Sequence, residues 1–297
     1  MSRDLSSLLA HGTQRLTEAG VPSPRHDAEA LAAYVLGTTR GELPRLPIVS
    51  TEDEARIEAA IFRRSRREPL QHITGIAAFR HLELEVGPGV FVPRPETEVM
   101  AGAAIAELRH LIAEGHAAPR AVDLCTGSGA VAIAMATEAP GTLVTGVELA
   151  AEAAAYAERN GSMHGIEIRT GDIADAVDDL ADTVQVVTAN PPYIPLSAWE
   201  SVDEEARIHD PELSLWSGHD GLDAIRLVAQ VAARLAVDGG LVACEHADVQ
   251  GESAPRVFAE TGLWHEVRDH PDLAGRSRFV TARRVPRSSA AAGTIAP

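Results

Sequence analysis

Cysteine is scarce in this chain, which has only Cys125 and Cys244 among its 297 residues. Two such cysteines make neither the disulfide framework of a small secreted domain nor a zinc cluster. The chain also has no apolar run of about 18 residues, the length that spans a bilayer, and no apolar segment typical of a secretory signal follows Met1. We therefore expect a soluble, cytoplasmic protein with no metal site and no membrane contact.

Positive charge is the second shortage. The chain has 26 Lys and Arg residues against 43 Asp and Glu residues, a formal net charge of −17. A nucleic-acid surface needs clustered Lys and Arg to neutralise phosphates, so we expect no direct nucleic-acid binding. One basic run is present, Arg63-Arg64-Ser65-Arg66-Arg67. It is interpreted either as a solvated helix end or as a patch that docks a partner or touches RNA.

The length of the chain and its 45% of hydrophobic residues allow one large or two modest domains. Residues 1–65 predict three short helices. Their signals are leucines at helical spacing that end at Gly20, a Ser23-Pro24 start followed by a stop at Gly37, and a capping box at Thr51–Glu54. Such a small bundle is not an obvious catalytic core.

Residues 72–92 have the alternating apolar pattern of strands. The pattern runs to Val86, is interrupted by Gly87-Pro88-Gly89, and resumes at Val90–Val92. This predicts a β-hairpin that turns at the glycines and ends at Pro93-Arg94-Pro95-Glu96-Thr97-Glu98. We expect residues 71–95 to link a helical domain, residues 1–70, to a larger domain, residues 96–285.

Strands and helices alternate from residue 97 onward. The predicted strands are 121–124, 143–148, 167–170, 184–189 and 240–245, and the predicted helices are 97–115, 129–138, 150–160 and 221–237. Alternation of this kind predicts an α/β fold with a parallel sheet covered on both faces. Two closely spaced strands, 264–270 and 278–283, predict an antiparallel pair at the end of the sheet. We expect the small, polar tail, 286–297, to be disordered.

The segment Asp123-Leu124-Cys125-Thr126-Gly127-Ser128-Gly129 joins the first strand of this alternating region to a helix. Glycines at such a turn let a ligand approach the backbone, and a helix N-terminus favours negative charge. The dinucleotide fingerprint Gly-x-Gly-x-x-Gly is not fulfilled, because Cys125 stands at its first glycine. A plain strand-to-helix turn is the alternative to a ligand-binding loop.

Acidic residues follow at the ends of the next two strands. Glu148 ends the second strand about 20 residues after the glycine turn, where a carboxylate can accept hydrogen bonds from both ribose hydroxyls of a nucleoside. Asp172 follows the third strand, where an acid can meet an adenine amino group and Ile173 can cover the ring. The alternatives are a surface carboxylate for Glu148 and a helix N-cap for Asp172.

The tetrapeptide Asn190-Pro191-Pro192-Tyr193 follows the β-branched run Val184–Ala189. Its prolines stop a strand and fix the direction of the backbone. The resulting corner presents an amide, backbone carbonyls and an aromatic ring, which suits gripping a planar amide or amino group. Because open α/β sheets bind ligands at the carboxyl ends of their strands, we expect this corner close to Glu148 and the glycine turn.

Taken in this order, the motifs resemble those of class I S-adenosylmethionine-dependent methyltransferases. The [Asn/Asp]-Pro-Pro-[Tyr/Phe] motif of that superfamily marks enzymes that methylate a planar nitrogen in adenine, cytosine or glutamine. The resemblance implies a Rossmann-like α/β fold, here with a small N-terminal helical bundle and a connecting β-hairpin. It also implies S-adenosyl-L-methionine as the methyl donor and S-adenosyl-L-homocysteine as the product.

Three flanking segments narrow the resemblance, namely Arg67–Gly75, Val90–Glu98 and Asp272–Arg278. With them the chain resembles the HemK/PrmC family, the peptide chain release factor glutamine methyltransferases, over about residues 5–284. This resemblance implies methyl transfer to the side-chain nitrogen N5 of the glutamine in the Gly-Gly-Gln motif of release factors. It further implies that the N-terminal bundle docks the protein substrate, and we expect a monomer.

The resemblance also assigns the site residues. The cofactor contacts fall on Asp123, Cys125, Thr126, Gly127, Ser128, Gly129, Glu148, Asp172, Ile173 and Asn190, and the catalytic residues are Asn190, Pro191, Pro192 and Tyr193. The chain departs from the family pattern where Cys125 replaces a glycine and where Cys244-Glu245-His246 replaces the usual Glu-Ile-Gly. We expect a small side chain at position 125 to be tolerated, and His246 to be a strand-end residue rather than a catalyst.

Three other functions remain open at this point. A ribosomal-protein glutamine methyltransferase would use the same chemistry on another protein. A DNA adenine-N6 methyltransferase would apply it to a flipped base, against which the net charge of −17 stands. A nucleoside-binding scaffold whose bundle recruits a partner would not be an enzyme.

Overall fold

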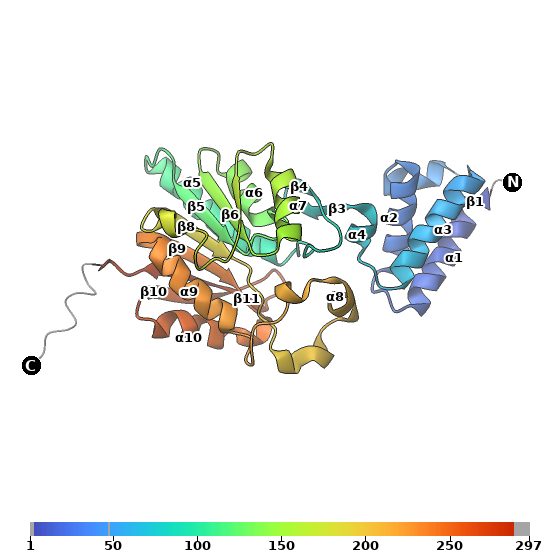
Figure 1. Ribbon diagram of the computed structural model, residues 1–297. Coiled ribbons are helices and arrows are strands. Elements are labelled where there is room, and N and C mark those ends of the chain that lie inside the picture. Colours follow the sequence, from blue (N-terminus) through green and yellow to red (C-terminus); the bar gives the residue numbers. More distant parts are fainter. Residues whose placement is uncertain (1–2, 47, 288–297) are drawn as a thin grey trace, which may run out of the picture. The chain divides into compact units, whose positions relative to one another are not determined.

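The structure, a computed structural model, describes residues 3–46 and 48–287. The chain forms two compact units (Figure 1). The helical unit comprises Met1–Ile76, Val86–Pro88 and Val202–Asp210, and the sheet unit comprises Ala77–Glu85, Gly89–Ser201 and Pro211–Pro297. From residue 288 onward, the tail expected to be disordered lies outside the described residues. Within the described residues, every helix is too short or too polar to cross a membrane.

The helical unit is a bundle of α1 (Leu5–Glu18), α2 (Pro24–Leu36) and α3 (Thr51–Ser65), joined by the short α4 (Leu70–Thr74). Its remaining elements are a two-stranded sheet of β1 (Arg3–Asp4) and β2 (Ile48–Val49), and the 3₁₀ helix η1 (Arg40–Arg45). The apolar stripes of the three long helices meet in one core that includes Leu16, Leu31 and Ile57, each fully buried. The sequence prediction of three helices is confirmed.

The ends of these helices follow local chemistry. Gly37 ends α2 in the left-handed region, at φ +61°, as the sequence predicted. The cap of α3 differs by one residue from the prediction, because Ser50 and not Thr51 precedes the helix. The Ser50 hydroxyl accepts the N–H of Asp53 at 3.0 Å and donates to the Asp53 carboxylate at 2.7 Å. The first helical residue is therefore Thr51.

The basic run at the end of α3 is engaged in pairs within the helical unit. Arg64, whose side chain is 6% exposed, donates to Asp27 at 2.7 Å and to Glu205 at 2.7 Å. Arg67 donates to Asp203 at 3.2 Å, and Arg63 pairs with Glu68. The run is thus neither a simple solvated helix end nor an open patch: much of its charge holds the segment Val202–Asp210, with α8 (Glu204–His209), in this unit.

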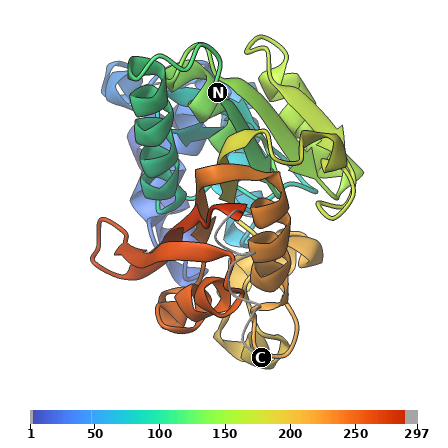
Figure 2. The same cartoon turned by 90° about the vertical axis from the view of Figure 1, so that its left-hand side faces the viewer.

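The sheet unit is built on one seven-stranded sheet in the order β10-β11-β9-β8-β5-β6-β7. The strands are β5 (Arg120–Leu124), β6 (Leu143–Glu148), β7 (Glu167–Thr170), β8 (Val184–Ala189), β9 (Ala236–Glu245), β10 (Trp264–Pro271) and β11 (Ser277–Arg284). The first five are parallel, and β11 is antiparallel to both β9 and β10. Figure 2 shows β10 and β11 side by side in red. The α/β prediction and the antiparallel pair are confirmed.

Helices cover both faces of this sheet (Figure 1). One core packs α5 (Thr97–Ala113) and α6 (Ala130–Glu138) against residues such as Ala121 and Val186. The other packs α9 (Asp223–Leu235) and α10 (Ser253–Glu260) against the alternate residues Val122 and Val187. The helix α7 (Ala151–Gly161) follows β6. Among the described residues, the unit also has the 3₁₀ helices η2 (Asp178–Leu180) and η5 (Asp248–Gln250). Two more, η3 (Leu196–Ser201) and η4 (Glu212–Ser214), lie in the connection between β8 and α9. Burial on both faces explains why the central strands β5 and β8 are rich in apolar residues.

The hairpin lies earlier in the chain than the sequence predicted. Its strands are β3 (Ile76–Phe79) and β4 (Leu82–Glu85), so the turn is at Arg80-His81. Arg80 adopts φ +53° there, and its side chain pairs with Glu138 and donates to the Glu98 carbonyl. Residues 90–92 form no strand, so the predicted turn at Gly87–Gly89 was wrong. The ion pair of Arg80 supports a turn that carries no glycine.

We expect Arg64→Ala to destabilise the helical unit by about 3–5 kcal/mol, because it leaves the buried carboxylate of Asp27 without its cation. Thermal unfolding of the full chain, with amide exchange followed in α2 and α3, measures the effect. Arg63→Ala is the matched control, since the half-exposed pair of Arg63 with Glu68 is worth at most about 1 kcal/mol. Equal effects of the two substitutions would contradict the buried role of Arg64.

Candidate active site

The glycine turn lies between β5 and α6, at the carboxyl edge of the sheet. Gly127 and Gly129 adopt φ +57° and φ +85°, and a Cβ added at Gly127 would meet no atom within 4 Å. The loop therefore needs glycine at position 127 for its backbone conformation, and leaves open space beside it. Cys125 also adopts a left-handed φ of +61°. This conformation explains why a glycine suits position 125, and it makes the cysteine a strained residue.

A buried carboxylate ties this loop to the neighbouring strand. Asp123 accepts a hydrogen bond from Thr126 Oγ1 at 2.7 Å on one oxygen and from Thr188 Oγ1 at 2.7 Å on the other. Burial raises the pKa of Asp123 to about 6, although both hydroxyls stabilise its charged form. Since Thr188 belongs to β8, two residues before Asn190, the Asp123 carboxylate links the glycine turn to the strand that carries the Asn-Pro-Pro-Tyr corner.

Glu148 lies at the end of β6, next to the glycine turn. Its carboxylate accepts the backbone N–H of Gly127 at 2.8 Å and that of Ala150 at 2.9 Å. The side chain is half-buried rather than free on the surface. The structure thus brings Glu148 and the turn together, as the sequence predicted from strand order.

The two residues expected at the adenine lie at the end of β7. Asp172 is exposed, and its carboxylate accepts the N–H of Ala174 at 2.9 Å. The residues that follow form a turn and not a helix, so Asp172 is not the helix N-cap raised as the alternative from the sequence. Ile173 is 7% exposed and packs in the core with Val147 and Val177. The backbone N–H of Gly171 donates to the Glu148 carbonyl at 2.9 Å, which keeps this turn beside the end of β6.

The Asn-Pro-Pro-Tyr corner follows β8 at the same edge. Asn190 Nδ2 donates to Thr97 Oγ1 at 3.3 Å, and Tyr193 Oη donates to Glu245 Oε1 at 3.3 Å. The carbonyl of Tyr193 accepts from Gln250 Nε2 at 3.0 Å. These bonds hold the corner by both of its ends. The loop beyond it is closed by pairing of Ile194 with Trp216 and by stacking of Trp199 on Trp216, with ring centroids 5.2 Å apart.

Sequence reasoning missed the role of Glu245 at the end of β9. Its side chain is 1% exposed, and burial raises its pKa to about 7. Hydrogen bonding from the hydroxyls of Thr97 and Tyr193 and the charge of Arg278 oppose that rise. Oε2 of Glu245 has no hydrogen-bond partner among the described residues. A signal was present, since the segments around Thr97 and Arg278 are two of the three that carried the family resemblance.

The segment Asp272–Arg278, which also carried the family resemblance, forms a loop that positions Arg278. Its guanidinium pairs with Asp272 at 3.2 Å, and the same carboxylate caps the loop by accepting the N–H groups of Ala274 and Arg276. The loop therefore fixes Arg278 next to Tyr193 and Glu245. Residues from α5, β8, β9 and β11 thus converge on one corner.

His246, the other departure from the family pattern, lies apart from these contacts. It is fully buried, and its ring nitrogens lie 2.9 Å from the Ala247 carbonyl and 3.0 Å from Asp269 Oδ1. Both nitrogens are therefore engaged with structural partners at the strand end, as expected from the sequence. Burial and the nearby carboxylates raise the pKa of the Cys125 thiol, which disfavours the thiolate that a nucleophilic cysteine needs.

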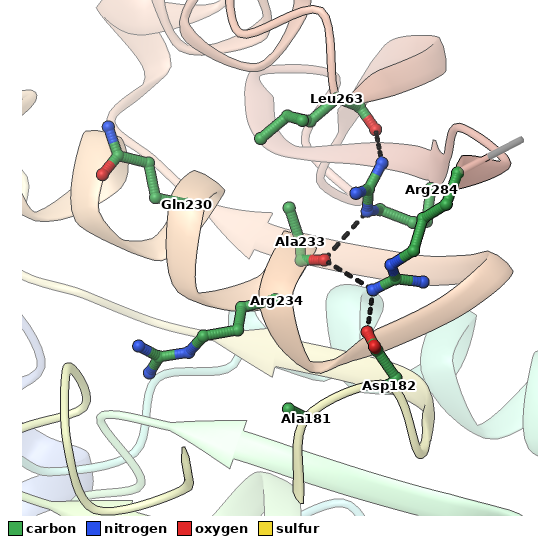
Figure 3. A pocket seen from close by; sticks show the side chains of 8 residues that line it. Ala181, Asp182, Gln230, Ala233, Arg234, Leu263 and Arg284 are labelled. Carbon is green, nitrogen blue, oxygen red and sulfur yellow. Dashed lines mark hydrogen bonds and ion pairs between the residues drawn. The ribbon is translucent and has the colours of Figure 1, made fainter. Parts of the chain in front are cut away.

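A separate hollow of about 350 Å³ lies at the opposite edge of the sheet (Figure 3). Asp182 in its wall precedes β8, whereas Asn190 follows that strand. Its arginines already have partners: Arg284 donates to the carbonyls of Ala233 and Leu263, Arg287 pairs with Asp182, and Arg234 pairs with Asp178. This hollow therefore offers no free cation for an anionic ligand. Among the residues that the structure describes, no cluster of three or more metal-ligating side chains occurs.

Comparisons with known proteins agree with this arrangement. The PrmC N-terminal domain model matches residues 7–75, and the methyltransferase small domain model matches residues 84–203. The release factor glutamine methyltransferase of Streptomyces coelicolor is 53% identical over 93% of this chain and 96% of its own length. That of Mycolicibacterium smegmatis is 41% identical over 96% of this chain and 99% of its own length.

One similar protein has a different name. The 4-amino-L-phenylalanine/4-methylamino-L-phenylalanine methyltransferase of Streptomyces pristinaespiralis is 39% identical over 90% of this chain and 91% of its own length. A protein of the same overall length and ancestry is thus named for an aromatic amine rather than for a glutamine amide.

The left-handed backbone at position 125 predicts an order of stability for variants. We expect Cys125→Val to be about 1–2 kcal/mol less stable than the natural chain, because a β-branched residue is disfavoured in that region. Cys125→Gly should be at least as stable as the natural chain, since glycine adopts this φ without strain. Thermal unfolding of the three proteins measures the order, and a valine variant as stable as the glycine variant would contradict it.

Proposed function

We infer that this chain, which belongs to the release factor glutamine methyltransferase family, methylates the side-chain nitrogen N5 of a glutamine in peptide chain release factors. Family membership rests on 53% identity over 93% of the chain. The observation that carries the activity is the Asn-Pro-Pro-Tyr corner, which lies beside the glycine turn and Glu148 at one edge of the sheet. Release factors work on ribosomes, so the proposed site of action is the cytoplasm.

The residues at this edge fit S-adenosylmethionine as the methyl donor. The open space at Gly127 leaves room beside the backbone, and the carboxylate of Glu148 lies 2.8 Å from the Gly127 nitrogen, in reach of ribose hydroxyls. We propose that the turn Cys125–Gly129, Glu148 and the Asp172–Ile173 turn hold the cofactor. When bound, S-adenosylmethionine supplies an electrophilic methyl group on a positively charged sulfur.

The corner supplies the chemistry that an amide nitrogen needs. The lone pair of a glutamine amide is delocalised into its carbonyl, so the nitrogen is a poor nucleophile. We propose that Asn190 Oδ1 accepts one N–H of the substrate amide and the Pro191 carbonyl accepts the other. Both dipoles then stabilise the positive charge that develops on nitrogen. Because Asn190 Nδ2 already donates to Thr97, its oxygen is the atom left for the substrate.

Positioning supplies the rest of the proposed acceleration. The two prolines fix the backbone of the corner, and Tyr193 is held by its hydroxyl at Glu245 and by its carbonyl at Gln250. A ring anchored in this way can stack on the amide plane and fix its angle of attack. Orientation of this kind is worth roughly 7–11 kcal/mol in favourable cases.

We propose that the helical unit docks the release factor. A single glutamine gives little specificity by itself, and the PrmC N-terminal domain model matches this unit over residues 7–75. The pairing of Arg64 and Arg67 with Glu205 and Asp203 makes α8 part of the proposed docking unit.

One assay tests the proposed function. Purified protein and labelled methyl donor are offered release factor, ribosomal protein, DNA and 4-amino-L-phenylalanine in separate reactions. We expect label on the glutamine of the release factor, with little in the other three. Label on 4-amino-L-phenylalanine alone would overturn the release factor assignment and favour the activity for which the Streptomyces pristinaespiralis protein is named.

We expect Asn190→Ala to lower kcat for release factor methylation about 100- to 1,000-fold, because it removes an acceptor that faces the developing charge. Binding of S-adenosylmethionine, measured by calorimetry, should stay within a few-fold of the natural value. Near-normal turnover of this variant would refute the role of Asn190.

We expect Glu148→Ala to act in the opposite way, with S-adenosylmethionine affinity reduced about 10- to 100-fold by the loss of hydrogen bonds to a charged group. Glu167→Ala, at the exposed start of β7, is the matched control and should leave affinity unchanged. Cofactor affinity that is the same in both variants would remove Glu148 from the proposed site.

A further inference from the structure

The carboxyl of Glu245 is the least explained group near the proposed site. It is 1% exposed at the end of β9, and its Oε2 has no hydrogen-bond partner among the described residues. An ionised carboxylate in such a place costs stability, because burial favours the neutral form. Because the buried Glu245 carboxyl lowers stability, we expect it to have a function other than packing.

The contacts of Glu245 lead to Asn190 through a threonine. Asn190 Nδ2 donates to Thr97 Oγ1 at 3.3 Å, and the Thr97 hydroxyl is close enough to the Glu245 carboxyl to lower its pKa by hydrogen bonding. Tyr193 Oη donates to Oε1 of the same carboxyl at 3.3 Å. Glu245 therefore interacts with Tyr193 directly and with Asn190 through Thr97, so it contacts both ends of the Asn-Pro-Pro-Tyr corner.

The protons shared among Glu245, Thr97 and Asn190 determine which end of the Asn190 amide faces Thr97. A threonine hydroxyl has one proton and a side-chain amide has one acceptor end and one donor end. While the Thr97 proton is directed at the carboxylate, its oxygen can only accept, so Asn190 must present Nδ2 to it. Oδ1 is then left for the substrate. If Glu245 is protonated, the Thr97 proton is free to turn to Asn190, and the amide can rotate by half a turn.

We propose that Thr97 and the ionised form of Glu245 are positioning residues, which together hold the Asn190 amide oxygen and the Tyr193 ring towards the substrate. This inference rests on the proposed function for the role of Asn190. It assigns a purpose to two segments that carried the family resemblance, since Thr97 belongs to the Pro-Arg-Pro-Glu-Thr-Glu hexapeptide and Arg278 faces Glu245 from β11.

The burial of Glu245 puts its titration in the range where the enzyme would work. Burial raises the pKa of Glu245 from 4.5 to about 7, and Glu96, before α5, adds to the rise. Arg278 from β11 and the hydroxyls of Thr97 and Tyr193 act against it. The ionised form, which holds Asn190, is therefore present above pH 7 and is lost as the pH falls through this value.

Kinetics of Glu245→Gln give the first test. We expect kcat for release factor methylation to fall about 100-fold, the effect of misplacing a reacting group, with S-adenosylmethionine affinity unchanged. In the natural chain kcat should fall as the pH drops below about 7, and this limb should be absent in the variant. Thr97→Val should behave like Glu245→Gln, whereas Thr97→Ser, which keeps the hydroxyl, should restore most of the activity.

Stability gives a second readout that needs neither cofactor nor substrate. A carboxyl whose folded pKa is raised stabilises the fold at low pH, and this contribution is lost as the pH rises through about 7. Glu245→Gln should therefore be at least as stable as the natural chain at pH 8, and its advantage should shrink at pH 6. A residue that served only the packing would instead lose stability on substitution at both values.

The third readout observes Asn190 itself. The side-chain NH₂ signals of Asn190, assigned by their absence from Asn190→Ala, should titrate with a midpoint near pH 7 in the natural chain and not in Glu245→Gln. Absence of that titration, or an unchanged kcat and pH profile in Glu245→Gln, would overturn the inference. If the natural chain left release factors unmethylated, the proposed function would fail, while the NMR titration would still decide the link between Glu245 and Asn190.

Discussion

The buried carboxylate of Asp123 is the contact on which the site depends. One of its oxygens accepts from Thr126 in the glycine turn and the other from Thr188 in β8, each at 2.7 Å. Through these two bonds the loop proposed to hold the cofactor and the strand that carries Asn190 share one anchor. A neutral residue of the same size would keep the sheet but lose the double acceptor, and the turn and the corner would then be free to move apart.

A second buried carboxyl, Glu245, has a corresponding place on the other side of the corner. Both residues end or nearly end a parallel strand, and burial raises the pKa of each. They differ in how well their charge is satisfied. Asp123 receives a short hydrogen bond on each oxygen, whereas Oε2 of Glu245 has no partner among the described residues. The Asp123 carboxylate therefore holds two segments together, and Glu245 is the group that we propose changes its charge state.

Much of the fold could be predicted from local pattern. The strands 143–148, 167–170 and 184–189 were predicted with the bounds that the structure shows, because each is a short segment between turn residues in a regular alternation with helices. The hairpin was misplaced, since its turn has no glycine and depends on the ion pair of Arg80 with Glu138, 58 residues away. The helix α8 was missed because its apolar pattern is weak and its place is given by Arg64.

The sequence by itself determined the order of strands and helices and the succession of glycine turn, ribose-site acid and Asn-Pro-Pro-Tyr, because these follow from spacing along the chain. It also indicated the family, through short segments around Thr97 and Arg278. Only the tertiary structure showed that these two segments meet Glu245 behind Asn190, and that Cys125 adopts a left-handed backbone. The reason is physical: hydrogen bonds and burial depend on distances between residues that lie up to 176 positions apart, and no local pattern records them.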